Sequence, residues 1–398
     1  MKWKQLVIPT IASALLLSGC SMKIPMGEEE ATPTGDETAA EGVTQAIEAR
    51  DSYYLMVIPF KPAAARGLAQ RQVSSSLELE EVELGLMRHS TDAFDPEKFA
   101  YQEGQLLNAE DVSRLLARKD KSNEGLTPLN PAYADGKAEV EDDKFVDANK
   151  KSPLYLASIV EQNYMTKEDS GYQVGGVSFA LILNREYVFQ APNYGPTYTV
   201  KLDQKKVIAE GERMANELVS QLRKREDFKD LDINVALYMK STQGSPTPGN
   251  YIKSAFVGTA DQVKSGDWKA IDEKYYYFPS TSATSDVRED AQKFTLFSDR
   301  IADLFPDYSG MIGKGFYQNG DLSRMEIDIP IQFYSRAELV GFTQHVVGLL
   351  ENRWEYSRNV PVRINVTSLG GDPEVTIVFE DGMDSPKYTS KGGEFRFF

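Results

Sequence analysis

The sequence has very little of the chemistry from which redox, metal or nucleophilic sites are built. Its 398 residues include one cysteine, Cys20, and two histidines, His89 and His345. Without a second cysteine no internal disulfide can form, so the stability of the folded chain must come from packing. Neither histidine has a His or Cys partner at metal-ligand spacing, and no Gly-x-Ser-x-Gly, His-Glu-x-x-His or phosphate-loop pattern occurs. We therefore expect no cofactor, no metal and no enzymatic activity, with both histidines in structural roles.

Acidic pairs are the remaining candidates for catalysis. Glu141-Asp142-Asp143 carries enough carboxylates for general acid-base work, as a wall hydrolase would need. In a chain with 60 acidic residues, such a run is more typical of a solvated face. We assign it no catalytic role.

Long apolar runs are also absent. The longest near the start is residues 6–17, which follows Lys2 and Lys4 and contains Pro9. A membrane-spanning helix needs about 20 apolar residues. A basic start, a short apolar core and small residues at its end are instead the order of a secretory signal peptide. We predict that residues 1–19 are removed as a leader.

The leader ends in a pattern typical of lipoproteins. Leu17, Ser18 and Gly19 form a cleavage motif directly before Cys20, whose thiol can be converted to a thioether with diacylglycerol. The alternative is an ordinary secretory leader followed by a chance cysteine. Because Cys20 is the only cysteine and stands at the required position, we predict a lipid anchor there. The protein would then be held on the extracytoplasmic face of the cell membrane through this lipid.

Positive charge is scarce as well. The formal net charge is −16, which argues against nucleic-acid binding, since that depends on Lys and Arg contacts to phosphates. It also argues against adhesion to anionic lipids or wall polymers. Residues 20–50 combine the lipidated Cys20 with an acidic stretch that has almost no large apolar side chains. Such a composition predicts a flexible tether.

About 350 residues remain after the tether, which is more than one core usually holds. We predict an α+β fold of two related units, each a mostly antiparallel or mixed sheet packed with helices, over residues 51–265 and 266–398. Before the repeat we expect a strand at 53–58, helices at 77–88 and 111–118, and a long surface loop at 123–151.

An internal repeat supports the two units. Apolar periodicity predicts a strand, a long helix and two further strands in each half, offset by about 130 residues. The first copy comprises 176–183, 207–225, 233–239 and 252–257, and the second comprises 325–334, 337–354, 360–366 and 375–379. A helix is predicted before each copy, at 152–165 and at 285–305, the latter with Ser285 as its N-cap.

One connection in the first copy is rich in aromatic residues. Tyr187, Phe189, Tyr194 and Tyr198 lie in about 20 residues that join the first strand to its helix, whereas the second copy makes the same connection almost directly. Inserted loops often carry binding sites, and exposed aromatic rings can stack on sugars. The protein would then bind cell-wall polymer, or another surface protein. The alternative is an extra strand whose aromatics cover the core. The run 275–278 is more typical of a linker strand between the copies.

The sequence resembles the CamS-type sex-pheromone lipoprotein family of Gram-positive bacteria. The segments that carry the resemblance span most of the chain after the tether: 83–88, 95–99, 103–105, 194–198, 331–334, 341–344 and 365–368. None of them is a catalytic signature. The resemblance implies that a short apolar peptide from the end of the leader acts as a pheromone that induces plasmid transfer. Here that peptide would be residues 13–19, Ser-Ala-Leu-Leu-Leu-Ser-Gly, which differs from the family's Ala-Ile-Phe-Ile-Leu-Ala-Ser type by lacking an aromatic and containing glycine.

Overall fold

The computed structural model describes residues 42–43, 54–68, 73, 75–120, 125–137, 139–169, 171–259, 261–264, 267–305, 308–368 and 370–391. These residues belong to one compact unit that begins at Glu41. The predicted leader and its cleavage motif, the lipidation site Cys20 and most of the predicted tether lie outside the described residues.

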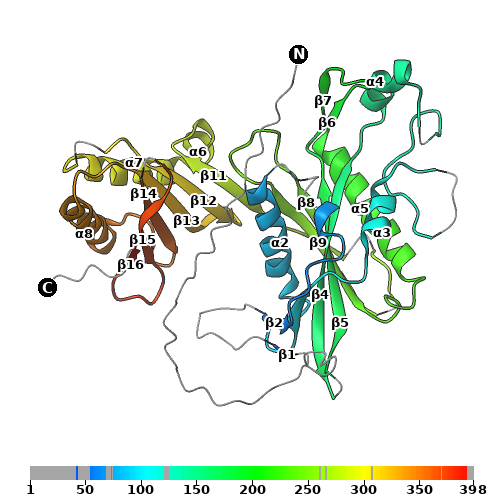
Figure 1. The fold of residues 1–398 in the computed structure, drawn as a ribbon, viewed down its shortest axis with the longest axis horizontal. Helices are drawn as coiled ribbons and strands as arrows, with labels where there is room; N and C mark the ends of the chain where they lie inside the picture. Colours follow the sequence, from blue (N-terminus) through cyan, green and yellow to red (C-terminus); the bar gives the residue numbers. More distant parts are fainter. Residues whose placement is uncertain are drawn as a thin grey trace, which may run out of the picture. The chain divides into compact units, whose positions relative to one another are not determined.

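The first half of the described chain forms a mixed sheet with helices on both faces (Figure 1). Its strands, in spatial order, are β1 (Gly42–Val43), β2 (Leu55–Ile58), β3 (Ala100–Glu103), β4 (Leu156–Glu168), β5 (Gly171–Leu183), β8 (Asp232–Met239), β9 (Asn250–Val257) and β10 (Trp268–Ala270). Helix α2 (Ser76–Ser90) covers one face, and α3 (Ala109–Leu116) and α5 (Gln204–Leu222) cover the other. Alternate residues of β5 therefore enter two cores: Ala180 and Ile182 pack against α2, whereas Phe179 and Leu181 join the core with α5.

The second half forms a mixed sheet that has helices on one face. The strands are β11 (Glu273–Phe278), β12 (Ile312–Gln318), β13 (Asp321–Pro330), β14 (Val362–Thr367), β15 (Pro373–Phe379) and β16 (Lys387–Ser390). The helices are α6 (Thr281–Asp286), α7 (Arg288–Ala302) and α8 (Arg336–Arg353). The inward-facing residues Ile327 and Ile364 pack with Phe297 and Phe342 of α7 and α8 in a single core.

The two sheets share one order of strands and one long helix. In each half an antiparallel hairpin leads into a long helix, and the next strand then pairs in parallel with the second strand of the hairpin. The first half has β4, β5, α5, β8 and β9 in this order, and the second half has β12, β13, α8, β14 and β15. Strand order and strand direction agree at every position, as an internal duplication requires. The first sheet extends to Ala270, and the second begins at Glu273.

Residues 152–165, predicted as a helix, are a strand. From Leu156 onward they belong to β4, which pairs antiparallel with β5 along most of its length. Both faces of β4 are covered, so the alternation of apolar and polar residues that identifies a strand is missing. Pairing with β5 and β3, rather than local periodicity, decides this segment.

Two further boundaries were predicted wrongly. Ser280, not Ser285, caps the helical segment, because its hydroxyl accepts from Ala283 N. That segment is also interrupted at Val287, where α6 ends before α7 begins. The loop predicted at 123–151 contains helix α4 (Asp142–Lys151), with acidic residues in its first turn and lysines in its last. This arrangement suits the helix dipole and offsets the low apolar content of the segment.

Candidate functional site

A cleft of about 1020 Å³ lies between helix α2 and the face of the second sheet that the described helices leave uncovered. Helix α2 supplies one wall of the cleft, and strands β11, β12, β13 and β14 supply the other. A volume of this order is at the upper end of the range typical of ligand-binding pockets. We therefore take the cleft as the candidate site.

Helix α2 can line the cleft because it has apolar residues on two faces. Val82 and Leu86 are fully buried against the first sheet. Gly85 allows this close packing, since a Cβ atom there would come within 2.4 Å of the Tyr251 ring. Leu77, Leu84 and Met87 line the cleft instead, and Leu84 is 46% exposed. An amphipathic surface helix normally hides its apolar residues, so this second face is available to a partner or ligand.

The opposite wall is polar around one aromatic ring. Alternate residues of β12 and β13 point away from α7 and α8 and line the cleft, among them Lys314, Arg324 and Glu326. Lys314 Nζ lies 2.8 Å from Glu326 Oε2. The Phe316 ring lies beneath two guanidinium groups, with Arg324 Cζ 4.3 Å and Arg88 Cζ 4.8 Å from its centroid. The Arg88 contact joins α2 to the second sheet, whereas the Arg324 contact lies within that sheet.

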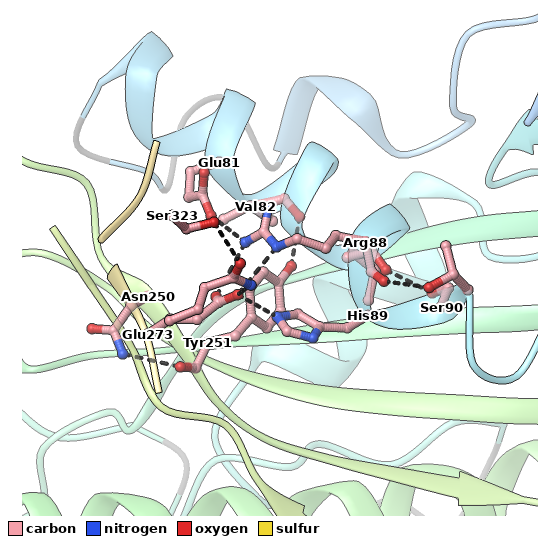
Figure 2. A network of polar contacts seen from close by, with 12 residues as sticks. Glu81, Val82, Arg88, His89, Ser90, Asn250, Tyr251, Glu273 and Ser323 are labelled. Carbon is pink, nitrogen blue, oxygen red and sulfur yellow. Dashed lines mark hydrogen bonds and ion pairs between the residues drawn. The ribbon is translucent and has the colours of Figure 1, made fainter. Parts of the chain in front are cut away.

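An ionic network at the base of the cleft is centred on Arg88 (Figure 2). Its guanidinium donates to Glu81 Oε1 at 2.8 Å and to both carboxylate oxygens of Glu273 at 3.1 Å. The Glu81 and Glu273 side chains are only 6% and 1% exposed. Glu81 also accepts from the Tyr275 hydroxyl, and Arg324 lies 3.6 Å from it. The network therefore ties α2 to strand β11 through charges that have little access to water.

Arg88 and His89 both contact the Glu273 carboxylate and affect its pKa. Burial alone would raise the pKa of this carboxyl, but contacts with His89 and Arg88 outweigh burial and lower the pKa to about 2. His89 Nε2 lies 3.2 Å from Glu273 Oε1 without hydrogen-bond geometry, so this contact is an ion pair that exists when the imidazole is protonated. The carboxylate thus stays charged throughout the physiological pH range.

The chemistry of the cleft suits binding better than catalysis. Its lining includes five carboxylates and four cations, so neither a polyanion nor a polycation is favoured. The buried charged residues Glu81 and Glu273 are both bonded to Arg88, and no nucleophile lies between them. Within the described ranges no group of His, Cys, Asp and Glu side chains could hold a metal ion. None of the described helices is long and apolar enough to cross a membrane.

The aromatic loop predicted from the sequence forms a separate hairpin of β6 (Glu186–Gln190) and β7 (Thr197–Lys201). Tyr187, Phe189 and Tyr198 stack in one row, with ring centroids 5.2 and 5.6 Å apart. Tyr187 also donates to Asn149 of α4 at 2.8 Å. Tyr194, at the tip, is 97% exposed. The structure therefore brings three of the four rings together as packing groups and leaves one accessible.

The histidines and the run 275–278 have clear structural positions. His345 Nε2 lies 3.1 Å from the carbonyl oxygen of Arg300, and its ring packs beside Phe305. The run 275–278 lies in β11, the first strand of the second sheet, and its Tyr275 belongs to the network. Sequence reasoning missed that network. Two of its members, Glu81 and Glu273, are almost 200 residues apart in the sequence. No local sequence pattern indicates that they share a site.

Comparison with known proteins agrees with this fold. The crystal structure of a sex pheromone precursor from Lactobacillus salivarius subsp. salivarius is similar, with a TM-score of 0.77 and 26% identity, covering 89% of this chain and 100% of that one. The structure of the C-terminal domain of the sex pheromone staph-cAM373 precursor from Staphylococcus aureus is also similar, with a TM-score of 0.67 and 27% identity. The match covers 82% of this chain and 100% of that one. No curated protein sequence matches this chain.

A family model assigns most of the folded chain. The model described as CamS sex pheromone cAM373 precursor matches residues 60–385, which include α2, the strands from β3 to β15 and the residues that line the cleft. That description names a peptide precursor rather than an enzyme. This chain is therefore a member of the CamS sex pheromone cAM373 precursor family.

Proposed function

We propose that this protein is a lipid-anchored, extracytoplasmic member of the family whose cleaved leader is a source of a peptide signal. The observation that carries the proposal is the motif Leu17-Ser18-Gly19-Cys20, which places the only cysteine of the chain directly after a short apolar leader. Family membership supports the peptide role, because its description is that of a pheromone precursor. The folded part is a non-enzymatic binding body held at the membrane by the lipid on Cys20.

Replacing Cys20 by Ala tests the anchor. Without the thiol no thioether can form, so we expect the protein to appear in the medium or to accumulate as unprocessed precursor. Fractionation, immunoblotting and intact-mass measurement distinguish these forms from the lipidated protein. Ser18→Ala is the matched control, because it keeps a small residue and the thiol. A Cys20→Ala protein of normal mature size in the membrane fraction would refute the lipid anchor.

A second candidate function is recognition of cell-wall glycan or peptide through the hairpin of β6 and β7. The observation that favours it is Tyr194, which is almost fully exposed and is held, together with Asn193, in the left-handed backbone region at the tip. A non-glycine residue rarely adopts this conformation, and such positions often mark functional loops. The net charge of −16 makes uncharged wall components better ligands than anionic polymers.

If the hairpin binds wall material, Tyr194→Ala should weaken that binding about tenfold, the effect of losing about 1.4 kcal/mol of ring contact. Co-sedimentation with purified wall material at several protein concentrations gives the two dissociation constants. Tyr334→Ala is the matched control, since Tyr334 is 80% exposed but lies in the second half of the chain. Equal affinities for wild type and Tyr194→Ala would exclude this role of the hairpin.

A further inference from the structure

A second pocket, of about 490 Å³, lies where strands β13 and β14 end and helix α8 begins. Ile331, Phe333 and Leu339 give it an apolar lining, and Arg336 and Glu374 supply one charge of each sign. β13 and β14 are parallel neighbours joined through α8. Crevices at the carboxyl ends of parallel strands are the usual ligand sites of sheets with this connection.

The corresponding region of the first half differs from this pocket. In the first half the corresponding ends of β5 and β8 are bridged by the first residues of the connection that follows β5. Arg185 donates to the Lys240 carbonyl at 3.3 Å, and Glu186 accepts from Gln243 N at 2.8 Å, so both residues bridge the ends of the two strands. The second half makes the same connection with residues 331–335 and leaves a pocket open.

The described chain ends beside this pocket. Lys391 N donates to the carbonyl oxygen of Glu374 at 2.9 Å, so the chain continues along β15 for one residue beyond β16. Arg336 donates to the Lys391 carbonyl and to the Ser390 hydroxyl, each at 3.3 Å. Arg336 and Glu374, which line the pocket, therefore both bind the last described residue, Lys391.

The sequence after Lys391 is complementary to the pocket. It reads Gly392-Gly393-Glu394-Phe395-Arg396-Phe397-Phe398, so three of the last four residues are Phe, with one acidic and one basic residue among them. These residues lie outside the described ranges. At roughly 3.5 Å per residue, Phe395 comes within about 14 Å of Lys391, and the two glycines put no side chain in the way. Glu394 and Arg396 match the charges of Arg336 and Glu374.

We propose that residues 394–398 dock into this pocket of their own chain, with phenylalanine side chains against Ile331, Phe333 and Leu339. Docking would make the pocket a regulated site, because an external peptide with the same aromatic pattern would compete with the segment.

Chymotrypsin, which cuts after phenylalanine, tests the docking in the full-length chain. We expect cleavage after Phe395 to be at least tenfold slower than in the Ser368→Phe variant, whose new ring would fill the pocket from the end of β14. Gln173→Phe on β5 is the matched control and should keep the slow rate. Mass spectrometry of the released fragment follows the reaction, and thermal melts establish that each variant is folded. Equal rates in wild type and Ser368→Phe would overturn the proposal.

A binding measurement keeps the proposal testable if Ser368→Phe does not fold. The full-length chain with Phe395, Phe397 and Phe398 replaced by Ala should bind the synthetic peptide Gly-Gly-Glu-Phe-Arg-Phe-Phe, and the wild-type chain should bind it at least tenfold more weakly. Equal affinity of both chains, or no binding to either, would contradict docking. If the wild-type chain forms a dimer and the alanine variant does not, the segment occupies the pocket of a second copy. That result would also overturn docking within one chain.

Discussion

Replacing Arg88 by Met is expected to lower the free energy of unfolding by about 3 kcal/mol, because it removes the cation that lies between two buried carboxylates. Glu81 and Glu273 would lose their shared hydrogen-bond donor, although their side chains are only 6% and 1% exposed. Met has nearly the length of the Arg stem, so the packing on Phe316 is largely kept and the lost charge dominates the effect.

Urea unfolding of wild type and variants measures this difference. Arg324→Met is the matched control, because Arg324 also stacks on Phe316 and lies 3.6 Å from Glu81, but its side chain is 49% exposed. An ion pair with a side chain that exposed contributes less than about 1 kcal/mol to the free energy of unfolding. Adding Glu273→Gln to Arg88→Met should recover part of the loss, since one unpaired charge is removed. A loss below about 1 kcal/mol for Arg88→Met would show that the network does not hold α2 against β11.

The synthetic leader peptide Ser13–Gly19 is expected to be at least a thousandfold less potent than the peptide Ala-Ile-Phe-Ile-Leu-Ala-Ser on cells that respond to the latter. Ala14, Leu15 and Leu16 stand where that pattern has Ile, Phe and Ile. A receptor pocket shaped for the larger groups loses roughly 1 to 3 kcal/mol at each poorly filled position. Three losses near the middle of this range amount to more than about a thousandfold, since each 1.4 kcal/mol is tenfold.

A clumping or plasmid-transfer assay with dilution series of both peptides gives the two potencies. The leader peptide with Leu15→Phe is the informative control and should recover about tenfold, because it restores the aromatic ring alone. Equal potency of the two natural sequences would mean that the receptor reads apolar character rather than side-chain shape.

The tertiary pairing of strands explains which elements local patterns could not predict. Strands β13, β14 and β15 were predicted close to their bounds, because apolar and polar residues alternate in them, as in Ile327, Asp328 and Ile329. Strands β12 and β16 of the same sheet were not predicted. The strand β4 was misread as a helix because both of its faces are covered and the alternation disappears. Helix α2 was recognised, yet the sequence did not reveal that its two apolar faces serve different partners.

The sequence by itself determined those features that depend only on residues close together in the chain. The repeated strand–helix–strand pattern and the family resemblance follow from spacings of a few residues or from a constant offset, and the predictions of a leader, a lipidation motif and an acidic tether rest on the same kind of local pattern. Tertiary structure alone decided the candidate sites. The Arg88 network joins Glu81 to Glu273, and the second pocket joins Ile331 to Glu374, across separations that no local pattern records. The energy between two charges depends on the distance between them in space and not on their separation in the sequence. Only the folded chain brings these charges close enough to interact.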